Sequence, residues 1–81
     1  MTHATRTVPA ALLHTTLARV LIAAEGGSAE RWAALLGPIE QLPATEDNSN
    51  WRVAPNATGD DLRAIKEAVG LVRKQFPYID G

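Results

Sequence analysis

Residues 58–76 read TGDDLRAIKEAVGLVRKQF, and Pro77 follows them. Apolar side chains recur in this stretch at spacings of three and four residues, which is the period of one face of an α-helix. Thr58 and Asp61 have the spacing of a capping box, with Asp in place of the usual Glu or Gln, and the residue before a proline is biased away from helical backbone. The stretch therefore predicts an amphipathic helix, whose apolar face would comprise Leu62, Ile65, Val69, Val72 and Phe76.

Another helix is predicted over residues 9–25, near the start of the chain. Pro9 suits the first helical turn, Thr7 is placed to cap it, and Gly26 supplies a stop signal at its end. One face of this helix would carry Leu13, Leu17, Val20, Leu21 and Ala24.

The same helix is apolar around much of its circumference, since Leu12 and Ile22 lie off the main apolar face and only Arg19 and Glu25 are charged. A single packing face would not bury all of this apolar surface. We therefore expect the helix either to lie at the centre of the domain, covered on two sides, or to contact a second copy of the chain. In the second case Leu12 and Ile22 would lie in a homodimer interface.

A short helix is predicted over Ala29–Leu36. Ser28 is a favourable N-cap residue for it, and Gly37 followed by proline ends it. Trp32 is expected to anchor this helix in the core, because a large aromatic side chain buries much apolar area.

Residues 39–54 form either a small hairpin or an irregular loop, and we expect the hairpin. Residues 51–53 alternate apolar and polar side chains, which is typical of a short edge strand. The region of Ile39 is its expected partner, across a polar turn at residues 45–50. An isolated two-stranded hairpin is only marginally stable, so Trp51 is expected to dock it on the helices.

The predicted fold is mainly α: a three-helix domain with a small two-stranded β-element between helices 2 and 3, or α+β if the hairpin is well formed. Residues 1–8 are expected to be a flexible N-terminal tail and residues 9–81 a single small globular domain. The expected core consists of Leu13, Leu17, Val20, Leu21, Trp32, Leu35, Leu36, Trp51, Leu62, Ile65, Val69, Val72 and Phe76.

Composition narrows the classes of function. The 81 residues carry a formal net charge of −1 with a pI near 6.0, whereas nucleic-acid binders usually show a basic excess. The chain contains no cysteine, which excludes disulfides and thiolate chemistry and fits a reducing, cytoplasmic location. Its longest apolar stretch is too short and too polar to span a membrane. Residues 1–24 carry arginines and no acids, which leaves a targeting segment as an alternative to a core helix.

Few residues are candidates for catalysis or metal binding. His3 and His14 are the only histidines, and His14 is expected to be a hydrogen-bonded structural residue at the border of its helix. The sequence contains no metalloprotease motif, no glycine-rich phosphate loop and no nucleophile elbow. We therefore expect no catalytic residues, no metal site and no cofactor, and a protein that is not an enzyme.

A basic surface is predicted opposite the apolar face of the 58–76 helix. It comprises Arg63, Lys66, Gly70, Arg73 and Lys74. Glycine inside a helix costs about 1 kcal/mol relative to alanine, and a partner's close approach to the bare backbone is one reason to place it there. An acidic peptide, another helix or a phosphate chain could bind, although Glu67 weakens the phosphate interpretation. The alternative is a solvated face whose charges match the helix dipole, with Gly70 tight against a neighbouring element.

The sequence thus favours a small module for protein–protein interaction: an adaptor, an assembly subunit or an inhibitor of another protein. Its expected partner is a protein with an acidic surface, with homodimerisation as a second possibility. The alternative function is DNA binding, because residues 28–37 resemble the first helix and turn of a helix-turn-helix unit. Residues 38–43 contain no basic residue and are too short for the recognition helix that should follow.

Overall fold

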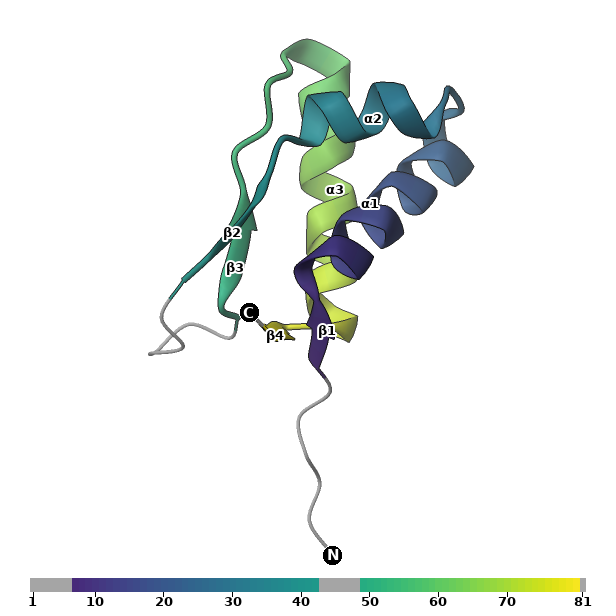
Figure 1. The fold of residues 1–81 in the computed structure, drawn as a ribbon. Coiled ribbons are helices and arrows are strands. Elements are labelled where there is room, and N and C mark those ends of the chain that lie inside the picture. The colour runs from purple at the N-terminus through teal and green to yellow at the C-terminus, as the bar shows by residue number, and fades with distance from the viewer. Residues whose placement is uncertain (1–6, 43–48, 81) are drawn as a thin grey trace, which may run out of the picture.

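The computed structural model describes residues 7–42 and 49–80, which form three helices and four short strands (Figure 1). In chain order the elements are β1 (Thr7–Pro9), α1 (Ala10–Glu25), α2 (Ala29–Leu36), β2 (Ile39–Gln41), β3 (Trp51–Val53), α3 (Gly59–Gln75) and β4 (Tyr78–Asp80). The fold is mainly α with a small antiparallel β-element between helices 2 and 3, which confirms the predicted fold class. Residues 1–6 of the expected tail, and residues 45–48 of the predicted turn, lie outside the described residues.

The glycine stop signals and the cap of α2 form as predicted. Gly26 has a φ of 81°, and its N–H donates to the Ile22 carbonyl at 2.8 Å, which closes α1. The Ser28 hydroxyl accepts a hydrogen bond from the Arg31 N–H at 3.1 Å at the start of α2. These local signals fix the helix boundaries because each satisfies a backbone group that the helix leaves unpaired.

One predicted cap is wrong, and another lacks its predicted hydrogen bond. Pro9 itself occupies the cap position of α1, because Thr7 lies in β1 two residues earlier. At the start of α3, Thr58 is the cap residue but its side chain makes no capping hydrogen bond. Gly59 directly after it has a φ of 63°, a left-handed conformation that is not the helical backbone of an ordinary first turn.

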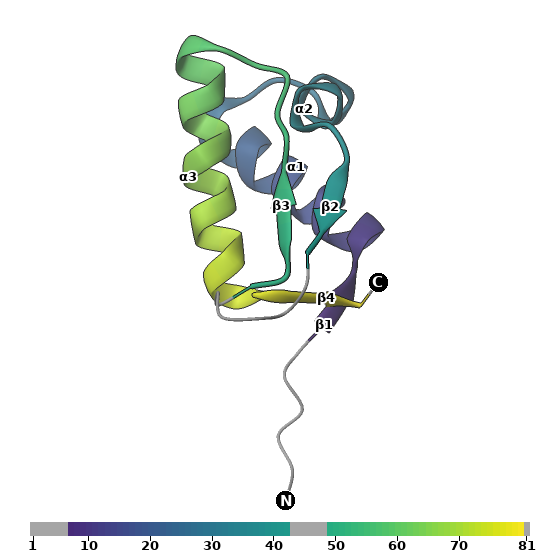
Figure 2. The same ribbon diagram turned by 90° about the vertical axis from the view of Figure 1, so that its left-hand side faces the viewer.

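α1 is the helix on which the other two pack, since both α2 and α3 contact it (Figures 1 and 2). Leu13, Leu17 and Leu21 on its inner face are buried completely or almost completely. The predicted central position of this helix is therefore confirmed. No helix in the described part of the chain is long and apolar enough to cross a membrane.

The predicted core is largely confirmed, but its edge on α3 is displaced. Expected core residues that are only half-buried are Val20, Leu35, Leu62 and Phe76. Buried residues that the pattern missed are Ala18, Ala64, Ala68 and Ile79. Alanine carries little apolar surface, so it adds little to a periodic signal. On α3 the two alanines extend the buried face to the side opposite Leu62.

A parallel pair of strands joins the two ends of the described fold. Thr7 pairs with Tyr78 and Val8 with Ile79 in the β1–β4 ladder. Thr7 and Val8, which the sequence assigned to a flexible tail, are therefore part of a paired strand. Ile79 is buried in the core, so the chain after Pro77 folds back over the helices as a strand.

Asn50 links the hairpin to β4 through its side chain. Its side-chain amide donates to the Ile79 carbonyl at 3.1 Å and accepts from the Ile79 N–H at 2.7 Å. Its backbone N–H donates to the Pro77 carbonyl at 3.0 Å, and its carbonyl accepts from Leu42 at 2.6 Å. One buried side chain, 8% exposed, thus takes the place of a further strand beside β4.

Candidate functional site

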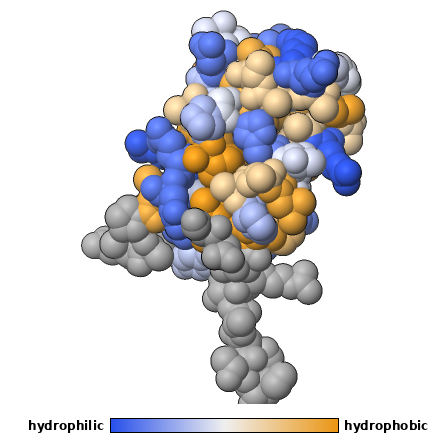
Figure 3. Space-filling model, in the orientation of Figure 1, coloured by the Kyte–Doolittle hydropathy of each residue, from blue (hydrophilic) through white to orange (hydrophobic). Residues whose placement is uncertain are grey.

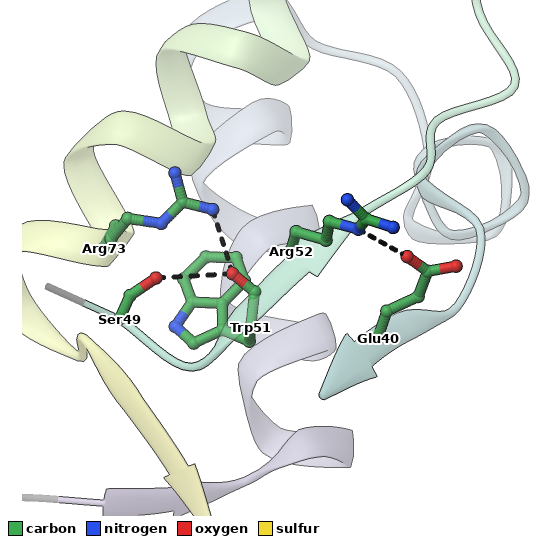
Figure 4. Close-up of polar contacts among 5 residues, drawn as sticks. All are labelled: Glu40, Ser49, Trp51, Arg52 and Arg73. Carbon is green, nitrogen blue, oxygen red and sulfur yellow. Dashed lines mark hydrogen bonds and ion pairs between the residues drawn. The ribbon is translucent and has the colours of Figure 1, made fainter. Parts of the chain in front are cut away.

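The structure divides the predicted basic surface into two parts. Arg63, Lys66, Gly70 and Lys74 are exposed on the outer face of α3. Arg73 is half-buried and turns towards the hairpin, where it contacts Trp51 (Figure 4). The sequence placed Arg73 on the basic face, but it could not show this contact because the contact depends on where β3 packs.

Arg73 fastens α3 to β3. Its Nη2 donates to the Trp51 carbonyl at 3.0 Å, and its guanidinium carbon lies 4.8 Å from the centre of the indole ring. The Trp51 carbonyl also accepts from the Ser49 hydroxyl at 3.4 Å, and the indole N–H donates to the Phe76 carbonyl at 2.8 Å. The Nε of Arg73 is buried and forms no hydrogen bond within the described residues.

A groove, here called the α3–β3 groove, runs between α3 and β3. Its lining residues are Arg52, Val53, Pro55, Ile65, Lys66, Val69, Gly70 and Arg73. The floor is apolar and the lining contains three basic residues and no acidic one. The space measures about 250 Å³, which is below the roughly 300–1,000 Å³ typical of small-molecule pockets. The groove is therefore smaller than a typical metabolite pocket.

The charges in this groove are only partly balanced. Arg52 forms an ion pair with Glu40, with 2.7 Å between Nε and Oε1 (Figure 4). Within the described ranges, Lys66 and Arg73 form no ion pair. Arg63 lies outside the groove and shares a shallow depression with Glu25, Asp60 and Glu67. The excess positive charge is therefore concentrated on the side of α3 that faces β3.

Gly70 leaves the α3 backbone open beside the groove. A methyl group built on Gly70 would meet no atom within 4 Å apart from the helix itself and its chain neighbours. The alternative explanation, that Gly70 is tight against a neighbouring element, is therefore wrong. Nothing in the described fold requires glycine at this position.

Replacing Gly70 with alanine is expected to stabilise the protein by about 1 kcal/mol, because alanine loses less backbone entropy in a helix and has open space here. For a domain of this size, that gain corresponds to a rise of roughly 4–8 °C in Tm. Thermal unfolding followed by circular dichroism measures it. An unchanged or lower Tm would mean that the α3 backbone at Gly70 is packed more tightly than the structure shows.

The residues suggested for a dimer interface have different environments. Leu12 is 52% exposed, whereas Ile22 is half-buried and packs against the core. Apolar residues gather over the N-terminal part of α1 and over β1 in Figure 3. Leu71 on α3, 59% exposed, is an apolar surface residue that the sequence reasoning did not single out. Dimerisation through α1 stays a prediction, which light scattering on the purified protein would test.

His14 forms a structural hydrogen bond. Its Nε2 lies 2.9 Å from the Gly37 carbonyl, so it ties α1 to the end of α2. In the described part of the chain, no three histidine, aspartate or glutamate side chains are grouped to hold a metal ion.

The element after α2 is the strand β2, whereas a helix-turn-helix unit requires a recognition helix there. The described chain therefore lacks the helix-turn-helix unit on which the DNA-binding alternative rested.

Comparisons with known proteins give no relative from which a function could be transferred. No protein-family model, no curated protein and no solved structure matches this chain.

Proposed function

We propose that the protein is a non-enzymatic interaction module that binds an acidic segment of another protein beside Gly70 on α3. The observation that supports this proposal most is the group of basic side chains without ion pairs, within the described residues, next to a bare stretch of helix backbone. The chain as a whole has a net charge of −1, so this positive region does not follow from its overall composition. A local positive region speeds association with a partner of complementary negative charge and disfavours partners that lack it.

Two depressions that meet at Gly70 extend this region along α3. One is the α3–β3 groove, and the other is lined by Gly70, Arg73, Lys74, Pro77 and Tyr78. A partner segment lying over Gly70 would therefore reach apolar surface as well as the positive charges. We expect modest, salt-dependent affinity, because exposed charges are screened at physiological ionic strength.

Replacing Gly70 with glutamate is expected to preserve the fold and to abolish binding of an acidic peptide. The new carboxylate would repel the negative charge of the peptide, and its side chain would occupy the open space beside the backbone. Fluorescence anisotropy with a labelled Glu- and Val-rich peptide measures the affinity at low and at physiological salt. We expect a loss of more than about tenfold, which corresponds to about 1.4 kcal/mol.

Ala23→Glu is the matched control. Ala23 is exposed on α1, so this variant gains the same charge on a different helix. Wild-type binding by Ala23→Glu together with loss in Gly70→Glu would support the site. If Gly70→Glu binds as well as the wild type, or if the wild-type protein binds no acidic peptide, the proposed function is wrong.

A further inference from the structure

We propose that the partner segment binds in extended form, as a strand added to the free edge of β3 within the α3–β3 groove. This inference rests on the proposed function and specifies the backbone conformation and side-chain pattern of the partner. It rests on three observations: which backbone groups of β3 point away from β2, where α3 lies, and which residues line the groove.

The register of the β2–β3 ladder shows which residues of β3 form hydrogen bonds to β2. Ile39 pairs with Val53 and Gln41 with Trp51, and the next pair in register, Leu42 and Asn50, is joined by a hydrogen bond at 2.6 Å. Hydrogen-bonded and non-hydrogen-bonded pairs alternate along an antiparallel ladder. The backbone N–H and carbonyl groups of Trp51 and Val53 therefore point away from β2.

The free edge of β3 faces α3. In Figure 2, β3 runs beside α3, and β2 lies on the other side of β3. At one end of this edge, Arg73 already donates to the Trp51 carbonyl. Outside the β2–β3 ladder, Val53 forms no hydrogen bond to any of the described residues, so its N–H and carbonyl are available to a partner backbone. An extended segment pairs with such an edge, whereas a helix satisfies its own backbone groups.

The groove lining sets the side-chain pattern of the added strand. Successive side chains of a strand point to opposite faces, so every second side chain would point in the same direction. Val53 and Val69 offer an apolar floor to one set, and Lys66 and Arg73 offer positive charge to carboxylates of the other set. The chemistry therefore fits a segment in which acidic and apolar residues alternate. The open backbone at Gly70 leaves room for it beside α3.

The test uses a short peptide of alternating Glu and Val and two derivatives that are N-methylated only at the Glu amides or only at the Val amides. Both derivatives keep the charge and the side chains, but each loses the amide donors on one edge of the extended peptide. If the peptide pairs with β3, one derivative should lose about tenfold or more in affinity and the other should bind like the parent. Slower hydrogen exchange of the Val53 amide upon binding is the second expected readout.

Charge reversal on α3 separates this inference from the proposed function. Lys66→Glu should weaken binding of the parent peptide more than Arg63→Glu, because Lys66 lines the α3–β3 groove and Arg63 does not. Strand addition would be overturned if Lys66→Glu and Arg63→Glu weakened peptide binding equally, or if the two methylated peptides bound with equal affinity. Either result would still be compatible with the proposed function, the binding of an acidic segment. If the parent peptide fails to bind the wild-type protein, the proposed function is overturned together with strand addition.

Discussion

Replacing Trp51 with alanine is expected to destabilise the protein by about 3–5 kcal/mol, the usual cost of truncating a buried aromatic side chain. Trp51 is completely buried, donates from its indole to the Phe76 carbonyl, and lies against the Arg73 guanidinium. The truncation would remove the contact that holds the hairpin on α3. A chain of 81 residues has a total stability of roughly 4–12 kcal/mol, so the loss is a large share of it.

Urea unfolding measures this effect, with Trp32 still available as a fluorescent reporter of the core. Trp51→Phe is the informative control, because it keeps most of the apolar area and removes only the donor to the Phe76 carbonyl. It should cost about 1–3 kcal/mol, the penalty for an unsatisfied buried acceptor together with the lost volume. If Trp51→Ala lowers the free energy of unfolding by less than Trp51→Phe, the docking role assigned to Trp51 is wrong.

Replacing Asn50 with aspartate is expected to cost about 3 kcal/mol or more. The amide donates to the Ile79 carbonyl and accepts from the Ile79 N–H, so both halves of the side chain are in use. A carboxylate can replace the acceptor, but it places an oxygen against the Ile79 carbonyl and buries a charge, and buried charges without a partner are more costly than neutral groups. The loss should detach β4 from the hairpin.

Asn56→Asp is the matched control for this substitution. Asn56 is exposed, and only its backbone N–H, which donates to the Leu35 carbonyl, takes part in a described hydrogen bond. The same chemical change at that site should alter the free energy of unfolding by no more than about 0.5 kcal/mol. Similar effects at positions 50 and 56, measured by urea unfolding, would argue against the link between Asn50 and β4.

Signals that involve neighbouring residues were readable in the sequence. The period of α3, the Ser28 cap of α2 and the glycine after α1 all predicted elements that the structure contains. The hairpin was also predictable, because residues 51–53 alternate and Trp51 needed a place to be buried. In each case the local preference agrees with the global fold, which is the condition under which sequence patterns are reliable.

The remaining features depend on residues that are distant in the chain. Strands of three residues, such as β1 and β4, show no measurable period, and their pairing joins the two ends of the described chain. Asn50 looked like an ordinary turn residue because its partner, Ile79, is 29 positions away. At the candidate site, the basic residues were predictable from the helix period. The groove was not, because its second wall is β3 and the orientation of Arg73 depends on the Trp51 carbonyl.

The parallel direction of β1 and β4 determines how the fold responds to mechanical force. The described part of the chain begins with β1 and ends with β4, and the two strands pair in parallel. Tension applied across the two ends would pull the strands in opposite directions along their common axis. All the hydrogen bonds between them would then carry the load together rather than opening one after another. This three-pair sheet would thus be loaded in shear, and its hydrogen bonds would resist unravelling of the helices from either end.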